Sequence, residues 1–277
     1  MKDILVLCDR NDSNNYRIET ALSYAKSFSS HLTGIHLLPY PVIPVYGGIY
    51  PNASLYTAAN QIDKANECAE QLKQEFLKSA EYFNIPCDWK TIEGLNLDFV
   101  IENARYTDLV VTPATYSHYS EQGSHHLCDY LSTNLGRPLL ILPDLNKTYD
   151  IPKRVIIAWN ESHEAARAVH DALPILQKAK HIQIISVSKN IKDEKENIIR
   201  CEQLQRHLRH HSIEADVFSP DKAEKGAGYT IYHGAVEYDA ELIVMGAYGH
   251  SRFKEIILGG TTKYLIEHTT LPLFVSN

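Results

Sequence analysis

Short apolar runs alternate with amphipathic stretches along the chain, and the whole alternation occurs twice. The run KDILVLCD opens the first half, and KRVIIAWN opens the second at Lys153. A polar turn and then apolar residues at helical spacing follow each run: Ile18, Ala21, Leu22, Ala25 and Phe28 in one half, Ala165, Ala168, Val169, Ala172 and Leu176 in the other. Continuous apolar runs of this length are typical of strands buried on both faces, so the pattern predicts two copies of one α/β unit.

The later segments of the two halves also correspond. HLTGIHLL matches HIQIISVS, PCDWKTIE matches EADVFSP, DLVVTP matches ELIVMG, and RPLLILP matches LPLFVSN. Helices are predicted between these strands at 63–84 and 98–106 in the first half and at 194–210 and 228–238 in the second, with Ser13 and Ser162 as N-caps of the first helix of each half. The alternation predicts parallel sheets with helices on both faces. We expect domains at 1–145 and 152–277, joined by a polar linker bracketed by prolines.

One segment of the first half has no counterpart in the second. Residues 39–61, PYPVIPVYGGIYPNASLYTAANQ, are rich in Pro and Tyr. We expect an ordered loop that packs on the other half, and a lid over a ligand or an aromatic interface remains an alternative.

Charge and composition exclude several classes of protein. The formal net charge of −7 over 277 residues argues against broad contact with a nucleic-acid backbone. No apolar run approaches the roughly 20 residues of a membrane span. The N-terminus reaches charged residues too soon for a signal peptide, so we expect a cytoplasmic protein without membrane contact.

The five cysteines and the closest histidines give weak signals for metal or redox chemistry. The cysteines are scattered and form no C-x-x-C pair, which favours reduced, mostly buried thiols, with one reactive thiol as the alternative. His207 and His211 lie four apart on a predicted helix and could share a metal ion, but no acidic or Cys partner has matching spacing. A solvated helix face is the preferred interpretation, and it also applies to His125 and His126.

The stretch MGAYGHSRFKEIILGGTT, residues 245–262, concentrates glycine after a buried strand and before the last helix. Glycine lets backbone N–H groups approach an anion closely, and a helix N-terminus adds unpaired N–H groups and partial positive charge. Hydroxyls and basic side chains that could support a phosphate are also present. The glycines are Gly246, Gly249, Gly259 and Gly260, the basic side chains are His250 and Arg252, and the hydroxyls belong to Thr261 and Thr262.

The expected fold would place this stretch where such sheets bind ligands. In an open doubly wound sheet, ligands lie outside the carboxyl ends of the strands, where the strand order reverses. The crevice would then be formed by Ala158, Trp159 and Asn160 on one side and by residues 246–252 on the other. The sequence predicts a phosphate site here, with a tight turn and a helix cap as the alternative.

With these residues the chain resembles a tandem universal stress protein of the UspA family along nearly its whole length. The family's ATP-binding signature is G-x2-G-x9-G-(S/T), which Gly246, Gly249 and Gly259 match. Gly260 takes the usual Ser or Thr position, and two threonines follow it. The resemblance implies two doubly wound five-stranded sheets of order 3-2-1-4-5, of HUP or Rossmann-like type, arranged as a pseudo-twofold dimer.

The resemblance also implies a nucleotide and its contacts. The adenine of ATP would pair with the backbone at Val187, and the ribose and phosphates would lie against the glycine loop. The family commonly has Asp where this chain has Asn160, so the resemblance leaves Mg²⁺ open, and Asn160 also suits a plain turn. The predicted nucleotide-binding residues are Ala158, Trp159, Asn160, Val187, Gly246, Gly249, His250, Ser251, Arg252, Gly259, Gly260, Thr261 and Thr262.

The first half lacks the glycines. Pro113 takes the place of Gly246, Tyr116 that of Gly249, and His125 and His126 those of the last two glycines. Proline has no N–H, and the larger side chains would occupy phosphate space. Asp9 is retained, but we predict that this half is a degenerate domain without ATP and that the closing strands LLIL and LFVS pair the two halves.

The leading hypothesis is a cytoplasmic, regulatory stress protein that binds ATP or another adenine nucleotide in its second half. We expect no catalytic residues, although His250 could polarise water in a slow ATPase. A nucleotide-free interaction module is the alternative from another class. A nucleotidyl transferase of the related HUP-like group would need a signature such as H-I-G-H, which the sequence lacks. A homodimer and a protein partner both remain open.

Overall fold

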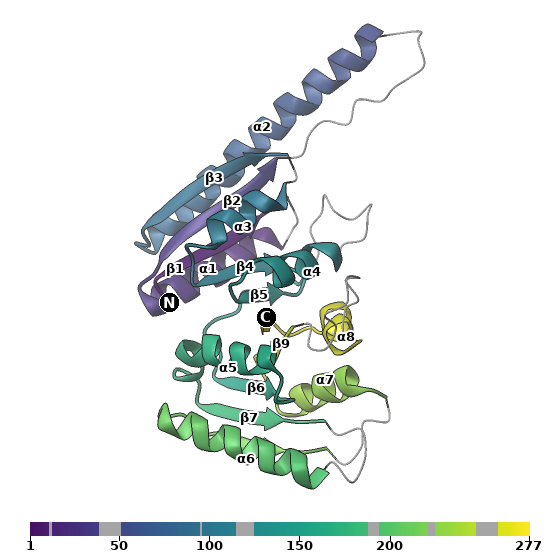
Figure 1. The fold of residues 1–277 in the computed structure, drawn as a ribbon. Helices are drawn as coiled ribbons and strands as arrows, with labels where there is room; N and C mark the ends of the chain where they lie inside the picture. The colour runs from purple at the N-terminus through teal and green to yellow at the C-terminus, as the bar shows by residue number, and fades with distance from the viewer. Residues whose placement is uncertain are drawn as a thin grey trace.

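The computed structural model describes residues 1–10, 13–38, 51–94, 96–114, 125–187, 194–220, 225–247 and 260–277, which form one sheet with helices on both faces (Figure 1). The first half contains, in chain order, β1 (Asp3–Cys8), α1 (Asn14–Phe28), β2 (His31–Leu38), α2 (Pro51–Tyr82), β3 (Cys87–Glu93), α3 (Leu97–Ala104), β4 (Leu109–Pro113), α4 (His125–Asn134) and β5 (Leu139–Leu142). The second half contains β6 (Arg154–Ala158), α5 (His163–Leu176), β7 (His181–Ile185), α6 (Glu194–His210), β8 (Asp216–Phe218), α7 (Ala227–Glu237), β9 (Leu242–Gly246), α8 (Gly260–His268) and β10 (Leu273–Ser276).

The strand order confirms the expected topology. The ten described strands run in the order β3-β2-β1-β4-β5-β10-β9-β6-β7-β8, so each half has the order 3-2-1-4-5. The two closing strands pair antiparallel, with Phe274 opposite Leu140. This pairing confirms that the closing strands LLIL and LFVS join the two halves, and it extends the two five-stranded sheets into one continuous sheet. An antiparallel junction is what a twofold relation between the halves would produce.

Strand residues alternate between two apolar cores, one on each face of the sheet. On β1, Ile4 and Val6 face the core beneath α1, α2, α5 and α6, whereas Leu5 and Leu7 face the core beneath α3, α4, α7 and α8. All four side chains are fully buried. Each additional buried Leu, Ile or Val stabilises the fold by roughly 1.5–3 kcal/mol, so both layers contribute strongly. Figure 1 shows the helices in these two layers.

Helix α2 departs most from the sequence prediction. It spans 32 residues from Pro51, whereas the sequence placed its start at Asp63 and assigned 39–61 to a loop. That assignment is wrong for residues 51–61, because proline suits the first helical position and no helix breaker follows it. The helix projects past the sheet in Figure 1, and its described residues from Ala59 to Lys64 are exposed. Residues 39–50 lie outside the described part of the chain.

The linker is fastened to both halves. The Tyr149 N–H donates to Thr20 Oγ1 (3.0 Å), and Ser23 Oγ donates to Asp150 Oδ1 (2.7 Å), which ties the linker to α1. The Tyr149 hydroxyl reaches the carbonyl of Thr270 in the second half (3.3 Å). Within the described ranges, no helix is long and apolar enough to cross a membrane.

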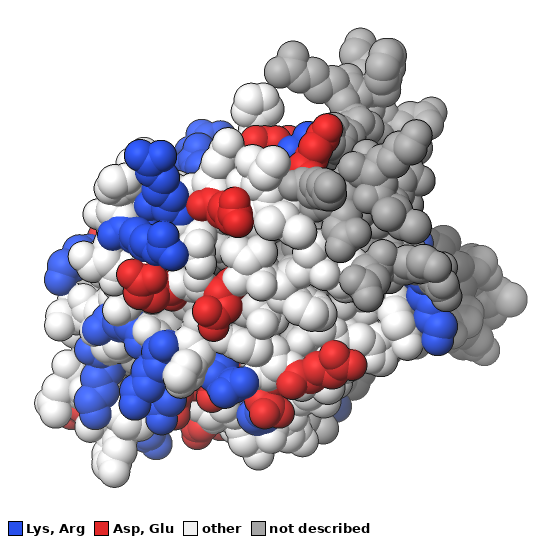
Figure 2. Space-filling model, turned by 90° about the horizontal axis from the view of Figure 1, so that it is seen from below, with Lys and Arg blue, Asp and Glu red and all other residues white. Residues whose placement is uncertain are grey.

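The surface on the α6 side carries charges of both signs. Figure 2 shows Lys and Arg side chains there with Asp and Glu side chains among them. Arg200 pairs with both Glu161 (3.0 Å) and Glu196 (3.4 Å), and Arg209 pairs with Glu214 (3.3 Å). These pairs are largely exposed and contribute little stability, but they break up the positive field that a nucleic-acid backbone would require on this face.

Candidate functional site

The strands of the second half end together at one edge of the sheet. Ala158 is in register with Ile185 of β7 and with Met245 of β9, so the chain leaves all three strands at the same level. Because β9 and β10 are parallel, α8 must run back between them, and its first residue, Gly260, lies near this edge. The structure thus brings the predicted residues of β6, β7, β9 and α8 to one end of the sheet.

The predicted residues divide between the two faces of the sheet. Ala158 and Val187 are half-buried and pack against the core beneath α7 and α8. The Trp159 side chain instead packs against the core beneath α5 and α6, and its backbone N–H donates to the carbonyl of Ile185 (2.8 Å). Its buried indole N–H has no hydrogen-bond partner in the described part of the protein. Only the backbone of Trp159 is therefore placed to contribute to a cleft on the α8 face.

Gly246 has a packing role that the sequence analysis missed. A Cβ at this position would lie 2.4 Å from the backbone nitrogen of Ala165 and 2.6 Å from the carbonyl carbon of Glu164. Glycine therefore lets the first turn of α5 rest directly on the end of β9, as glycine does where a helix packs closely on a strand. The glycine count alone gave no signal for this contact, which joins segments far apart in the sequence.

Gly260 differs from Gly246, because a Cβ there would meet none of the described residues within 4 Å. It is exposed at the start of α8, followed by the half-buried Thr261 and the buried Thr262. The predicted residues Gly249, His250, Ser251, Arg252 and Gly259 lie outside the described part of the chain.

Asn160 forms a turn. Its Oδ1 accepts from the N–H of Ser162 (3.1 Å), and Ser162 Oγ accepts from the N–H of Ala165 (3.1 Å), which confirms Ser162 as the N-cap of α5. Between them, Glu161 adopts a left-handed φ of 60° and pairs with Arg200 of α6. Because this turn engages the Asn160 oxygen, the contacts agree with the plain-turn alternative and offer no support for a metal ligand.

A buried contact next to Val187 was also missed by the sequence analysis. Ser186 is 3% exposed and forms a side-chain hydrogen bond with Cys201 of α6. Burial raises the pKa of the Cys201 thiol to about 11, although the bond from Ser186 acts in the opposite direction. The contact holds the end of β7 against α6. The alternation of residues along the strand was the available signal, since it directs Ser186 to the face opposite Val187.

The five cysteines are free. Burial raises the pKa of Cys8 to about 12, and it also raises the pKa values of Cys87 and Cys128. A raised pKa leaves little thiolate at neutral pH, so these positions are poor nucleophiles. Cys68 is half-buried on α2.

The corresponding edge of the first half is occupied by internal contacts. Asp9 is fully buried and pairs with Arg17 of α1, with 2.5 Å between Oδ1 and Nη2. Arg17 Nε also donates to the carbonyl of Leu7 (2.7 Å). The thiol of Cys128 on α4 contacts the carbonyl of Pro113 (3.4 Å). These contacts agree with the prediction of a structural first half. Tyr116 lies outside the described residues, and His125 and His126 begin α4.

The first helix of the first half is capped differently from its counterpart. Ser13 takes the N-cap position as predicted, but its side chain makes no capping hydrogen bond. Its Oγ is buried and has no partner among the described residues. The first turn of α1 is instead tied to β1 through Asn14 Oδ1, which accepts from the Asp9 N–H (3.1 Å).

His207 on α6 contacts His211, the first residue after that helix, with ring centroids 4.9 Å apart. The described side chains contain no group of three or more His, Cys, Asp or Glu suited to hold a metal ion. The solvated-face interpretation is therefore kept for this pair.

The pKa of His207 predicts a pH effect on stability. Burial first, and then the neighbours His211, His210 and His170, lower this pKa from its ordinary value of 6.5. The unfolded chain then binds more protons than the folded chain, so stability is lost as the pH falls through 6.5 and below. We expect the melting temperature of wild type between pH 7.5 and 5.5 to fall by about 1 °C more than that of His207→Gln, because the site is largely exposed. Equal falls would contradict the prediction.

The fold and this edge define a doubly wound α/β protein of the kind that binds ligands at the carboxyl ends of its strands. Residues 152–277, the second half of the chain, match the model of the universal stress protein family. A universal stress protein from Archaeoglobus fulgidus has the same fold along 99% of this chain and 98% of its own, with 18% identity and a TM-score of 0.74. One described as a universal stress protein from Pseudomonas aeruginosa covers 100% of this chain and 93% of its own, with 14% identity and a TM-score of 0.61.

These comparisons confirm the resemblance to a tandem universal stress protein. The family model identifies the second half, and the solved structures extend the shared fold to both halves. At these identities the structural likeness concerns the fold alone. A comparison with curated proteins found no match.

Proposed function

We propose that this chain is a cytoplasmic regulatory protein that binds an adenine nucleotide, ATP in the first instance, in its second half. The observation that carries the proposal is the shared position of Ala158, Val187 and the start of α8, which lie on one face and at one edge of the sheet. That edge is where doubly wound sheets bind nucleotides, beside the point at which the strand order reverses.

Each described part of this edge suits one part of the nucleotide. The backbone at Val187 would pair with the adenine, and the small side chain of Ala158 leaves room for the base beside it. The N-terminus of α8 would face the phosphates with its unpaired N–H groups and partial positive charge. Thr261 adds a half-buried hydroxyl there. The glycine-rich sequence between β9 and α8 would supply the remaining N–H groups.

The residues at the site fit a nucleotide better than they fit a metal. Asn160 brings no negative charge, and its Oδ1 already accepts from Ser162. We therefore do not assign a Mg²⁺ ligand to this chain. A universal stress protein of solved structure is in complex with cAMP, but its TM-score to this chain is 0.35, so the proposal rests on the residues of this chain.

Direct titration tests the proposal. We expect calorimetry to show one molecule of ATP binding per chain with a Kd below about 1 mM, and Gly249→Val to weaken it tenfold or more because the new side chain would fill phosphate space. Tyr116→Val, at the aligned position of the first half, is the matched control and should change nothing. Titrations with ADP, AMP and cAMP, each with Mg²⁺ and with EDTA, would define the preferred ligand. No binding at millimolar ATP would reject the site.

A nucleotide-free interaction module is the second candidate, and the packing of Gly246 on α5 is the observation that favours it. That contact gives one glycine of the stretch a purely structural reason. The same titration separates the two candidates. Slow hydrolysis is a variant of the first proposal, and a turnover assay that compares wild type with His250→Ala tests it.

A further inference from the structure

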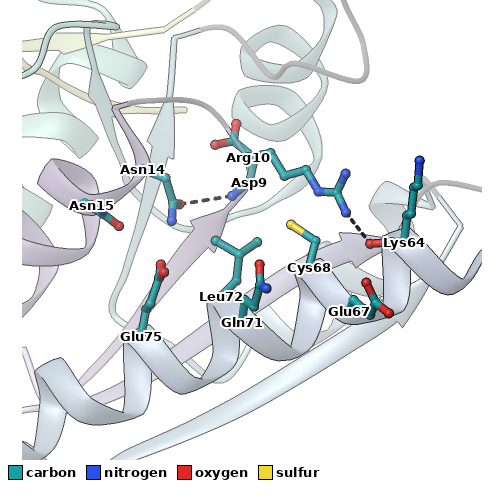
Figure 3. Close-up of a pocket in the computed structure, with 10 residues that line it drawn as sticks. All are labelled: Asp9, Arg10, Asn14, Asn15, Lys64, Glu67, Cys68, Gln71, Leu72 and Glu75. Carbon is teal, nitrogen blue, oxygen red and sulfur yellow. Dashed lines mark hydrogen bonds between the residues drawn. The ribbon is translucent and has the colours of Figure 1, made fainter. Parts of the chain in front are cut away.

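An open pocket lies in the first half, between the start of α1 and the middle of α2 (Figure 3). Its volume of about 580 Å³ is within the range of small-molecule sites. Asp9 and Arg10 at the end of β1 form one wall, and the side chains of Cys68, Leu72 and Glu75 of α2 face it.

This pocket is separate from the proposed nucleotide site. It belongs to the other half of the chain, and it lies on the α1 and α2 face of the sheet rather than on the face of α3 and α4. The carboxylate of Asp9 is directed to Arg17 of α1. At the equivalent place in the second half, between the turn after the first strand and the second helix, Glu161 pairs with Arg200 and joins the turn after β6 directly to α6.

A buried hydrogen-bond donor without a partner lines the pocket. Asn14 is 3% exposed, and its Oδ1 accepts from both the Asp9 N–H (3.1 Å) and Arg17 Nη2 (3.0 Å). These two donors fix the orientation of the amide, so Nδ2 is the atom left over, and it is buried without a hydrogen-bond partner among the described residues. An unsatisfied buried donor destabilises the protein, and an acceptor on a ligand would remove that cost.

Two further positive features, one at each end of the pocket, favour an anionic acceptor (Figure 3). Arg10 Nη2 donates to the carbonyl of Lys64 (2.9 Å), which holds the guanidinium across the end of the pocket. The first turn of α1 points its N-terminus to the Asn14 end and has no side-chain cap from Ser13. A carboxylate beside Asn14 would gain from the helix N-terminus, whereas the Arg10 guanidinium adds positive charge at the Lys64 end of the pocket.

The α2 side offers the complementary charge. The carboxylates of Glu75 and Glu67 lie on the rim, while Leu72, 7% exposed, provides an apolar floor between them. The Asp9 carboxylate is balanced by Arg17, and the cations Arg10 and Lys64 match the two glutamates in number. A wall with both signs and no net charge disfavours a polyphosphate and suits a ligand that carries one charge of each sign.

We propose that this pocket binds a small zwitterion of the amino-acid or short-peptide class that carries an apolar side chain. Its carboxylate accepts from Asn14 Nδ2 at the N-terminus of α1, its ammonium donates to Glu75, and its side chain lies on Leu72. The proposal is independent of the nucleotide site, because it uses only residues of the first half.

Calorimetric titration of the full chain without nucleotide tests this proposal with four probes. L-leucine and L-alanyl-L-leucine carry both charges, N-acetyl-L-leucine lacks the ammonium, and L-leucinamide lacks the carboxylate. We expect at least one of the two zwitterions to bind with a Kd below about 10 mM, and both single-charge compounds to bind about tenfold more weakly or not at all. Comparison of the first two probes distinguishes a free amino acid from a peptide.

A pair of variants locates the site. Glu75→Gln should weaken the zwitterion about tenfold, because it removes the charge that faces the ammonium. Glu81→Gln is the matched control, because it makes the same change on an exposed residue of α2 outside the pocket, and it should leave affinity unchanged. Both positions are exposed, so neither variant threatens folding. The proposal is overturned if neither zwitterion binds, if a single-charge compound binds equally well, or if Glu75→Gln has no effect.

Discussion

Replacing Gly246 with alanine is expected to lower the free energy of unfolding by about 3 kcal/mol, at the upper end of what overpacking costs. The new methyl would lie 2.4 Å from the backbone nitrogen of Ala165. No side chain can rotate to relieve that contact, so α5 would have to move away from β9. Urea denaturation without nucleotide measures the effect on packing alone.

Gly260→Ala is the matched control for Gly246→Ala. A Cβ at Gly260 meets no atom of the described residues within 4 Å, so we expect a change in stability of less than about 0.5 kcal/mol. Similar stability in the two variants would contradict the packing role of Gly246. The comparison also matters for nucleotide binding, because a loss of affinity in Gly246→Ala would reflect a displaced α5 as much as a lost phosphate contact.

The sequence predicted the fold well because the signals for the fold are local and repeated. Continuous apolar runs marked the strands, and the resemblance to the universal stress protein family implied the order 3-2-1-4-5, which the structure confirms. The start of α2 was missed because residues 51–61 continue the Pro- and Tyr-rich segment 39–61, although no helix-breaking residue follows Pro51. The pairing of β5 with β10 was expected, although these strands lie far apart in the chain.

The candidate site was predicted less completely, because its details depend on contacts between distant segments. The sequence analysis placed Ala158, Val187 and Gly260 at one edge of the sheet, and in the structure they lie at that edge. The sequence did not show that the Trp159 side chain packs on the opposite face of the sheet. It also did not show that the first turn of α5 packs directly against Gly246. In the first half, Asp9 was noted as the retained acidic residue after the first strand. Nothing in the sequence indicated that Arg17 is its ion-pair partner.

Replacing Arg17 with methionine is expected to have the largest effect on stability, a loss of about 3–5 kcal/mol. The change leaves the Asp9 carboxylate buried without the guanidinium 2.5 Å away, and it also removes the donor to the Leu7 carbonyl. Removing one partner of a buried pair costs more than the pair itself contributes, because the remaining charge stays desolvated. Chemical denaturation of the purified variant measures the loss.

Two further variants separate the buried charge from the loss of an arginine. Arg167→Met is the matched control, because Arg167 lies on α5, the counterpart of α1, and forms an exposed pair with Asp171 (3.0 Å); it should cost less than about 1 kcal/mol. The double variant Asp9→Asn with Arg17→Met should recover part of the stability lost in Arg17→Met, because it removes the buried charge. If Arg17→Met costs no more than Arg167→Met, the pair does not hold the first half together. If ATP binding survives in the double variant, the first half supports the fold while the second half carries the nucleotide.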